Sequence, residues 1–142
     1  MHQQVLIGKK SMIVRGLALR LVRHNPQKDW SGEIRDLHAF VRDNIRYVRD
    51  IRHVETIQSA EKTLEFGQGD CDDKSILLAS LLESISHPTR FVAISLSDDP
   101  ENYVHVFPET KIGERWVSLE TTEPVAVGWL APDIAKKMIY FN

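Results

Sequence analysis

The most reactive side chain in this sequence is the thiol of its single cysteine, Cys71. Cys71 follows Gly-Gln-Gly-Asp at positions 67–70 and precedes a long apolar-rich segment, so we expect it at the start of a buried helix. The unpaired N–H groups and the partial positive charge of a helix N-terminus favour a thiolate, and the same groups stabilise a developing oxyanion. The two glycines allow a sharp turn and the close approach of a substrate.

Three neighbouring carboxylates, those of Asp70, Asp72 and Asp73, oppose the ionisation of this thiol. A helix terminus contributes only about 0.3 to 1 kcal/mol, less than about one pKa unit, and does not outweigh them alone. Cys71 therefore needs a cationic partner. His105 is the natural candidate, because an imidazolium beside the sulfur favours the ion pair and then carries the proton.

A third group must hold the imidazole ring in place. Glu120 belongs to the next expected strand, and its carboxylate is suited to accept a hydrogen bond from the other ring nitrogen of His105. Taken singly, these residues are better explained as an inert buried cysteine and a structural histidine. Their order and context favour a catalytic triad of Cys71, His105 and Glu120.

Helices are expected in the first part of the chain. Residues 11–24 have apolar side chains at helical spacing, and Asn25-Pro26 ends this helix. Ser31 is the expected N-cap of a second helix that runs to about Tyr47. A connection with a short helix at residues 60–66 leads to the central helix, which begins at Cys71, is buried on most sides and ends at His87-Pro88.

Strands are expected in the second part of the chain, at residues 89–96, 103–107 and 115–121, with a turn at residues 97–100 and a loop at Gly113. Helices followed by strands indicate an α+β fold in which an antiparallel sheet covers the central helix. Further along, Ala131-Pro132-Asp133 is able to start a short helix, and residues 138–141 to add a strand or contact a partner.

The composition limits the architecture and the partners. A chain of 142 residues with 42% hydrophobic and 27% charged residues supports one core, so we expect a single domain over residues 1–142. The net charge of -2 and pI near 6.3 give no general reason to expect binding to nucleic acid or membrane. A lone cysteine, the short apolar run near the N-terminus and the absence of a spanning segment predict a cytoplasmic protein.

Three blocks of sequence resemble the transglutaminase-like cysteine enzymes, a branch of the papain-like superfamily. The blocks are GDCDDKSILLASLL at 69–82 followed by HPTRFV at 87–92, YVHVF at 103–107, and WVSLETT at 116–122. The resemblance covers about residues 34–129 and is closest to compact versions from bacteria and their phages and prophages. It implies a papain-like core with Cys71 as nucleophile, His105 as base and Glu120 as acid. The family usually has aspartate at the third position, with Glu123 as the alternative acid here, and the second cysteine of the protease signature is absent.

The favoured function is a cysteine-dependent hydrolase of peptides or amides, which acts on a protein or peptide substrate with an amide or glutamine acyl group. Transamidation is the same chemistry with an amine in place of water. A non-catalytic subunit that binds phage-particle proteins is the first alternative. A nucleic-acid binder that uses the basic face of the second helix is the other, but aspartates are interleaved with its arginines.

Weaker signals concern the surroundings of the triad. Gln58 is a candidate oxyanion donor, although a polar surface role explains it as well. Trp116 is a candidate groove wall near the histidine strand, or a core residue. The aspartates around Cys71 are better explained as helix-start residues, partly neutralised by Lys74, than as a cation site. No cofactor and no metal are expected, because the other histidines form no HxH or HExxH pattern.

Overall fold

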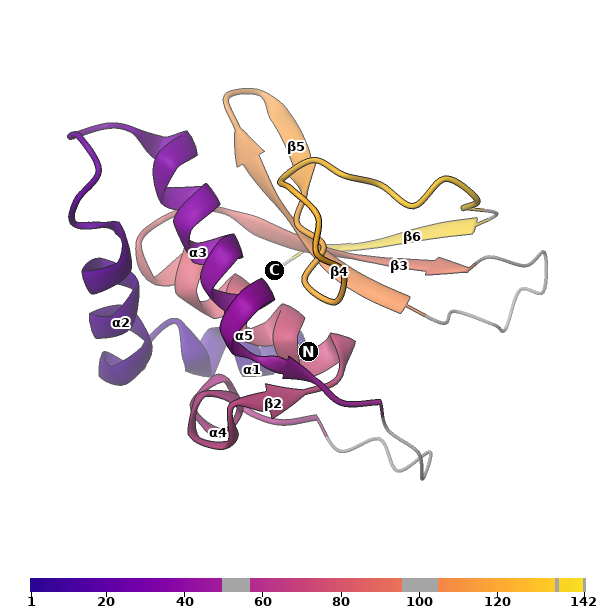
Figure 1. Cartoon of the computed structure of the whole chain (residues 1–142), viewed down its shortest axis with the longest axis horizontal. Helices are drawn as coiled ribbons and strands as arrows, with labels where there is room; N and C mark the ends of the chain where they lie inside the picture. Colours follow the sequence, from indigo (N-terminus) through magenta and orange to yellow (C-terminus); the bar gives the residue numbers. More distant parts are fainter. Residues whose placement is uncertain (50–56, 96–104, 135, 142) are drawn as a thin grey trace.

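A computed structural model of the chain describes residues 1–49, 57–95, 105–134 and 136–141. Helices precede the strands of the main sheet along the chain, which gives the α+β arrangement that the sequence predicts (Figure 1). The turn expected at residues 97–100 lies outside the described residues, as do Tyr103 and Val104 of the expected histidine strand.

Two short strands are interspersed among the helices, and the four strands of the main sheet follow them. The helices are α1 (His2–Gly8), α2 (Met12–Val22), α3 (Trp30–Asn44), α4 (Ala60–Phe66) and α5 (Cys71–Ser84). The strands are β1 (Arg46–Tyr47), β2 (Gln68–Gly69), β3 (Thr89–Ser95), β4 (His105–Ile112), β5 (Arg115–Ser118) and β6 (Lys136–Phe141).

The main sheet has four strands in the order β5-β4-β3-β6, and each neighbouring pair is antiparallel. In this register Ile94 pairs with His105 at one end of β4, and Lys111 pairs with Trp116 near the other end. A second, two-stranded parallel sheet pairs Tyr47 of β1 with Gly69 of β2. Since β2 ends just before Cys71, the small sheet fixes the chain that enters α5.

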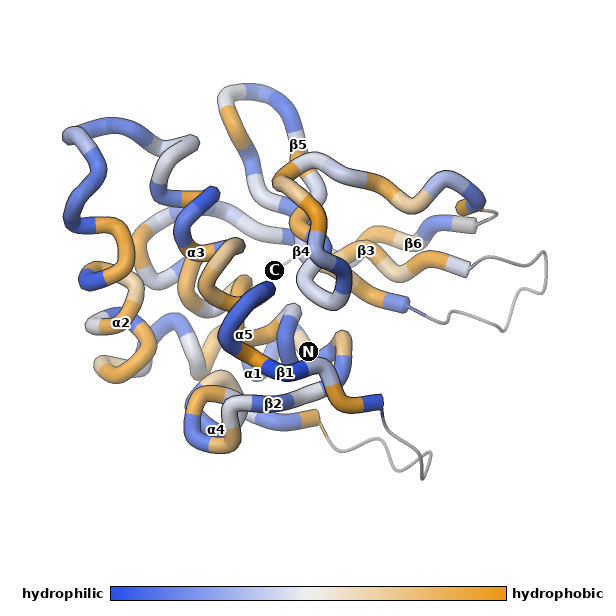
Figure 2. Tube along the Cα trace, in the orientation of Figure 1, coloured by the Kyte–Doolittle hydropathy of each residue, from blue (hydrophilic) through white to orange (hydrophobic). Residues whose placement is uncertain are grey.

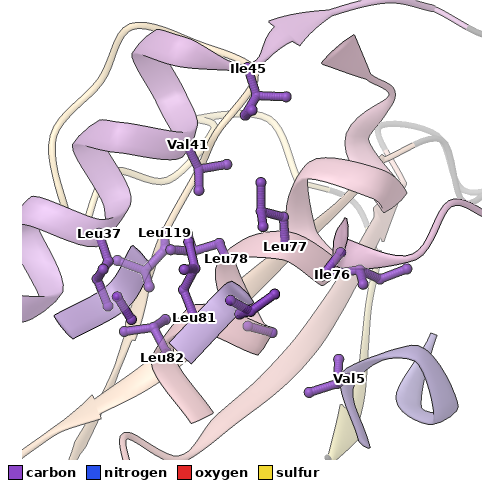
Figure 3. Close-up of a cluster of buried hydrophobic side chains, with 14 of the residues drawn as sticks. Val5, Leu37, Val41, Ile45, Ile76, Leu77, Leu78, Leu81, Leu82 and Leu119 are labelled. Atoms are coloured by element: carbon purple, nitrogen blue, oxygen red, sulfur yellow. The ribbon is translucent and has the colours of Figure 1, made fainter. Parts of the chain in front are cut away.

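Helix α5 is the centre of the molecule. Every residue from 73 to 82 is buried, and α5 packs against α1, α2, α3, α4, β3 and β4. Figure 3 shows Leu78 and Leu81 of α5 beside Leu37 of α3 and Leu119, which follows β5, whereas Ile76 lies on the side of Val5. Burying one such side chain stabilises the fold by roughly 1.5 to 3 kcal/mol, so α5 is a rigid support for the thiol at its N-terminus.

Several boundaries agree with the sequence predictions. Helix α4 occupies residues 60–66, and α5 begins at Cys71. Helix α2 has Ser11 as its N-cap, whose Oγ accepts a hydrogen bond from the Val14 N–H at 3.3 Å. The strand expected at residues 89–96 is β3, which ends at Ser95 within the described residues.

The second expected helix, α3, has different ends. Its N-cap is Asp29 and not Ser31, because the Asp29 carboxylate accepts the Gly32 N–H at 3.1 Å. Both residue types cap helices well, so spacing alone did not choose between them. The helix ends at Asn44, and Tyr47 lies in β1, where pairing with β2 gives the backbone other partners.

The strands also differ in length from the predictions. Strand β4 continues through Pro108 and polar residues to Ile112. Two of these polar side chains are satisfied internally, since Glu109 accepts from Arg90 at 2.7 Å and the Thr110 hydroxyl donates to the Pro88 carbonyl at 2.7 Å. Strand β5 is shorter than expected and ends at Ser118.

At the two ends of the described chain, a helix joins the core and a strand extends the main sheet. Helix α1 was not predicted, and it packs closely on α5. Residues 131–134 form no helix, whereas the strand expected at 138–141 is present as part of β6.

The connection between α2 and α3 is hydrophilic along its length (Figure 2). In the described part of the chain, each helix is too short or too polar to cross a bilayer.

Candidate active site

The candidate active site forms where the N-terminus of α5 meets the beginning of β4 and the end of β5. Cys71 is the first residue of α5, His105 is the first of β4, and Glu120 comes two residues after β5. The Ser75 hydroxyl donates to the carbonyl of Val106 at 3.3 Å. Ser75 lies one helical turn after Cys71, so this hydrogen bond holds β4, which begins at His105, against the helix that begins at Cys71.

The N-terminus of α5 is closed by a capping box. The Asp73 N–H donates to the Asp70 carboxylate at 2.9 Å, and the Asp70 N–H donates back to Asp73 at 3.1 Å. The two aspartates therefore act as helix-start residues, as the sequence predicts. Among the described residues, no group of three or more His, Cys, Asp or Glu side chains is placed to hold a metal ion.

Gly69 makes this closed turn possible. A Cβ atom at position 69 would lie 2.6 Å from the Cβ of Asp73, closer than side-chain carbons pack. Asp73 also accepts the N–H of Gln58 at 2.8 Å, which ties the segment before α4 to the first turn of α5. The backbone around Cys71 is thus fixed from both sides.

His105 and Glu120, the base and acid expected from the sequence, form a hydrogen-bonded pair. Nε2 of His105 lies 2.6 Å from Oε2 of Glu120, and only 21% and 6% of the two side chains are exposed. The other carboxylate oxygen, Oε1, accepts both the N–H and the hydroxyl of Thr122 at 2.9 Å. Because the carboxylate is held on both oxygens, it orients the imidazole firmly.

The charge of His105 follows from its surroundings. Burial alone would lower the pKa of His105, but hydrogen bonds to Cys71 and Glu120 and their negative charges outweigh burial and raise it to about 10. Burial would likewise raise the pKa of Glu120, whereas the hydrogen bonds from His105 and Thr122 lower it overall. The pair is therefore an imidazolium facing a carboxylate at neutral pH.

The thiol completes the arrangement. Since Nε2 of His105 is occupied by Glu120, Nδ1 is the ring nitrogen left to meet Cys71, whose side chain is in hydrogen-bonding contact with the ring. Cys71 is half-buried. A partly accessible sulfur beside a cation at a helix N-terminus has the surroundings of a reactive cysteine.

Tyr47 lies near Cys71 and Glu120, and it was not among the site residues expected from the sequence. Burial, followed by the negative charge of Cys71, raises the pKa of its phenol, and Asp70 and Glu120 act in the same direction. Tyr47 is brought there by the pairing of β1 with β2. The two-residue strand leaves no periodic pattern, so the sequence carried no sign of this position.

Lys74 does not neutralise the aspartates as expected. Its side chain is 2% exposed and points to the C-terminal end of α3, where Nζ donates to the carbonyls of Ile45 at 2.7 Å and Arg42 at 3.5 Å. Burial lowers the pKa of Lys74 despite the nearby charges of Glu120 and Asp43. The lysine instead satisfies helix-end carbonyls that would otherwise be buried without partners.

The two weaker site candidates, Gln58 and Trp116, lie in different parts of the molecule. Gln58 lies beside the first turn of α5 through its main chain, while its side-chain oxygen accepts from Thr63 at 3.1 Å. Trp116 lies on β5 at the far end of β4, six residues or about 20 Å along the strand from His105. Its ring packs under the Arg90 guanidinium at 4.4 Å. The groove role of Trp116 therefore stays a prediction, as does the oxyanion role of Gln58.

The family of the chain follows from its sequence. Residues 16–121 match the family model of the transglutaminase-like superfamily, which covers more than half of the 142 residues. The chain therefore belongs to the transglutaminase-like superfamily, in agreement with the resemblance of its three sequence blocks. No individually curated protein matches it.

Solved structures of other proteins share the fold, among them the two that follow. A provisionally assigned cysteine protease from Cytophaga hutchinsonii superposes with a TM-score of 0.63 at 22% identity, over 92% of this chain and 46% of its own. A provisionally assigned protease from Parabacteroides distasonis ATCC 8503 gives a TM-score of 0.66 at 11% identity, over 81% and 24%. At these identities the likeness shows the fold alone, and the chain spans less than half the length of either neighbour.

Proposed function

We propose that this protein is a cysteine-dependent hydrolase of peptide or amide bonds, with Cys71 as nucleophile, His105 as general base and acid, and Glu120 as the orienting acid. The observation that carries the proposal is the 2.6 Å hydrogen bond between Nε2 of His105 and Glu120, which leaves Nδ1 of the same ring to interact with Cys71. Membership of the superfamily supports the same assignment.

In the first half-reaction the Cys71 thiolate attacks the carbonyl carbon of the substrate, and the carbonyl π electrons move to oxygen. The backbone N–H groups at the start of α5 are suited to stabilise this oxyanion. When the oxyanion collapses, the C–N bond breaks and the His105 imidazolium gives its proton to the departing amine nitrogen. The products are a free amine, a thioester on Cys71 and a neutral imidazole.

In the second half-reaction His105 takes a proton from water while the water oxygen attacks the thioester carbon. Collapse of this second tetrahedral intermediate breaks the C–S bond, and the sulfur leaves as the thiolate beside the restored imidazolium. Glu120 stabilises the imidazolium whenever His105 is protonated and keeps the ring aligned throughout. The sum is one water added across one amide bond.

The substrate we propose is a protein or peptide with an amide or glutamine acyl group. A cavity of about 410 Å³, at the small end of the usual range for ligand sites, is lined by residues 42–47, Lys74 and residues 121–124, which directly follow Glu120. Hydrolysis is favoured over transamidation, because a domain of this size has little surface with which to exclude water and bind a second substrate.

One buried cluster spans Val5 to Leu119, which supports a single domain over residues 1–142.

The test combines labelling with turnover. Wild type, Cys71→Ala and His105→Ala are compared for alkylation by iodoacetamide at about pH 6, well below the ordinary thiol pKa of about 8.5. The same proteins are incubated with a glutamine-containing peptide library, with and without an amine donor, and new termini or amine adducts are read by mass spectrometry. We expect alkylation and cleavage in wild type and in neither variant, with all three folded by circular dichroism.

Three outcomes would change this assignment. Amine adducts without cleavage would make transamidation the activity. A wild-type cysteine that is inert at about pH 6, together with no turnover, would overturn catalysis and leave the binding-subunit alternative. A wild-type phenotype that persists in the Cys71→Ala variant would likewise overturn catalysis.

A further inference from the structure

Glu120 is held by a second histidine that the proposed mechanism does not use. His38, on α3, is 1% exposed, and its Nε2 lies 2.5 Å from the main-chain carbonyl oxygen of Glu120. The two residues are 82 positions apart in the sequence. The contact therefore joins the helical part of the molecule to the chain segment that presents the acid.

The chemistry of this contact fixes the tautomer of His38. A carbonyl oxygen only accepts hydrogen bonds, so Nε2 must carry the proton. The other ring nitrogen, Nδ1, is buried and has no hydrogen-bond partner in the part of the chain that the structure describes. A proton on Nδ1 would bury an unpaired charge, which is strongly unfavourable, so the ring is a neutral Nε2–H donor.

The charged groups around His38 agree with this state. Burial is the largest influence and lowers the pKa of His38, and the nearby Arg42 guanidinium acts in the same direction. The hydrogen bond to Glu120 and the negative charges of Glu120 and Asp43 oppose burial without overcoming it. Glu120 thus has a charged histidine at its carboxylate and a neutral one at its carbonyl.

The position of Glu120 explains why its carbonyl needs such a partner. The Leu119 N–H still donates to the Pro108 carbonyl at 2.9 Å, but β5 ends at Ser118 and the strand ladder stops there. A buried carbonyl beyond the end of a strand needs another donor, and His38 supplies it. The residues just before each partner, Leu37 and Leu119, lie in one buried cluster (Figure 3).

A second contact from α3 holds the same segment. Arg42, one helical turn after His38, donates from a guanidinium nitrogen to the carbonyl of Val125 at 3.0 Å. The guanidinium is at the same time paired with Asp43 at 2.7 and 2.8 Å, so its direction is fixed. Two side chains from one face of α3, those of His38 and Arg42, therefore hold the segment that carries the acid, at the carbonyls of Glu120 and Val125.

We propose that His38 is a positioning residue of the triad, whose neutral imidazole holds the main chain of Glu120 so that the carboxylate meets His105. This inference rests on the proposed function, since it assigns His38 a role in presenting the acid of that triad. His38 touches neither substrate nor sulfur in this role. It acts through Glu120, whose carboxylate Thr122 holds separately.

The variants that test the proposal differ in whether residue 38 is able to donate a hydrogen bond to the main-chain carbonyl of Glu120. His38→Gln places an amide N–H near the position of Nε2, whereas His38→Leu removes the donor and keeps much of the volume. Val41→Ala removes apolar packing from the same buried face of α3 without touching Glu120. Alkylation of Cys71 is followed from about pH 5 to 9, together with urea denaturation.

We expect His38→Leu to lose about tenfold in alkylation rate at pH 6, the scale of one lost hydrogen bond that leaves a buried carbonyl unpaired. His38→Gln should restore most of that rate. Val41→Ala should lose stability and keep the wild-type pH profile. If His38→Leu does not fold, His38→Asn takes its place, because its amide is too short to reach the carbonyl.

A second readout does not depend on the thiol. In protein with ¹⁵N-labelled histidine, His38 should show a neutral ring with its proton on Nε2 down to about pH 5.5. The low-field proton of the hydrogen bond between His105 and Glu120 should be present in wild type and His38→Gln, and shifted or lost in His38→Leu. A charged His38, or a proton signal and pH profile that His38→Leu leaves unchanged, would overturn the proposal.

The two assignments fail in different ways. If alkylation at about pH 6 depends on His105 but not on His38, the hydrolase stands and the positioning role falls. If alkylation does not depend on His105, the hydrolase falls, while the tautomer of His38 and the proton signal still decide whether this histidine holds Glu120.

Discussion

Nε2 of His105 and Oε2 of Glu120 are 2.6 Å apart, although a glutamate carboxylate lies one methylene further from the main chain than the aspartate usual in this family. The extra length is accommodated because the carboxylate turns back toward its own chain. There its other oxygen accepts two hydrogen bonds from Thr122, two residues later. Hydrogen bonds thus hold both oxygens of the Glu120 carboxylate. They restrict the longer glutamate side chain, which has one more rotatable bond than aspartate.

Two substitutions separate the length of the Glu120 side chain from its charge. Glu120→Asp shortens the side chain and keeps the charge, whereas Glu120→Gln keeps the length and removes the charge. We expect Glu120→Gln to keep a hydrogen bond to His105 but to lower the imidazolium fraction, which reduces alkylation of Cys71 at pH 6 by about tenfold or more. Glu120→Asp should lose as much, because the carboxylate withdraws from the ring. Thr122→Val, which keeps the charge and one of the two restraints, should show a smaller loss. Equal rates in all four proteins would show that Glu120 does not orient the base.

The raised pKa of His105 makes the stability of the protein depend on pH. The folded value of about 10 lies above the usual value of 6.5, so the stabilisation is complete below 6.5 and is lost as the pH rises through 10. The free energy of unfolding of wild type should therefore fall relative to His105→Gln between pH 6 and pH 10.5 by at least about 2 kcal/mol. Urea denaturation at several pH values measures this difference. A difference that grows with pH would contradict the ion pair.

The proximity of Cys71, His105 and Glu120 was predictable because the three residues stand in order within distinctive sequence blocks. The helix that begins at Cys71 was also predictable, since residues 76–82 are almost all apolar. The sequence also carries a readable signal for His38. It lies four residues after Ile34 and three before Val41 on a buried helix face, a place where a polar side chain must have a partner.

Other features depended on contacts between distant segments, which spacing does not reveal. The amino group of Lys74 has carbonyls from α3 as its partners, 29 and 32 residues earlier, so its burial was not evident from the neighbouring aspartates. Strand β4 extends past Pro108 because Arg90 pairs with Glu109 across the sheet. In each case a charged residue is buried only because a remote part of the chain satisfies it.

Asp73 should make the protein less stable as the pH rises, whereas a carboxylate in an ion pair makes a protein more stable as the pH rises. Burial raises its pKa from the usual 3.8 to about 6, against the lowering effect of hydrogen bonds from Gln58 and Asp70. Its contribution to stability is therefore complete below about 3.8 and lost as the pH rises through about 6. Relative to Asp73→Asn, wild type should lose about 1 to 2 kcal/mol of unfolding free energy between pH 4 and pH 7. Chemical denaturation over this range measures it, and a relative gain in stability would refute the buried charge.

Gly69 and Gly113 offer a matched pair of substitutions. A Cβ at position 69 would lie 2.6 Å from Asp73 Cβ, a helix atom unable to move without shifting the start of α5, whereas Gly113 has open space around it but a φ of +63°. We expect both Gly69→Ala and Gly113→Ala to cost about 1 to 3 kcal/mol of stability, the first by crowding and the second by backbone strain.

Only Gly69→Ala should also slow the alkylation of Cys71 at pH 6, because it displaces the turn that sets the sulfur against His105. Gly113 lies in the turn between β4 and β5, at the end of β4 away from His105, so Gly113→Ala should react at the wild-type rate. Denaturation curves and alkylation rates from the same preparations separate the two effects. Equal losses of reactivity in both variants would mean that thiol reactivity follows overall stability and not the geometry of this turn.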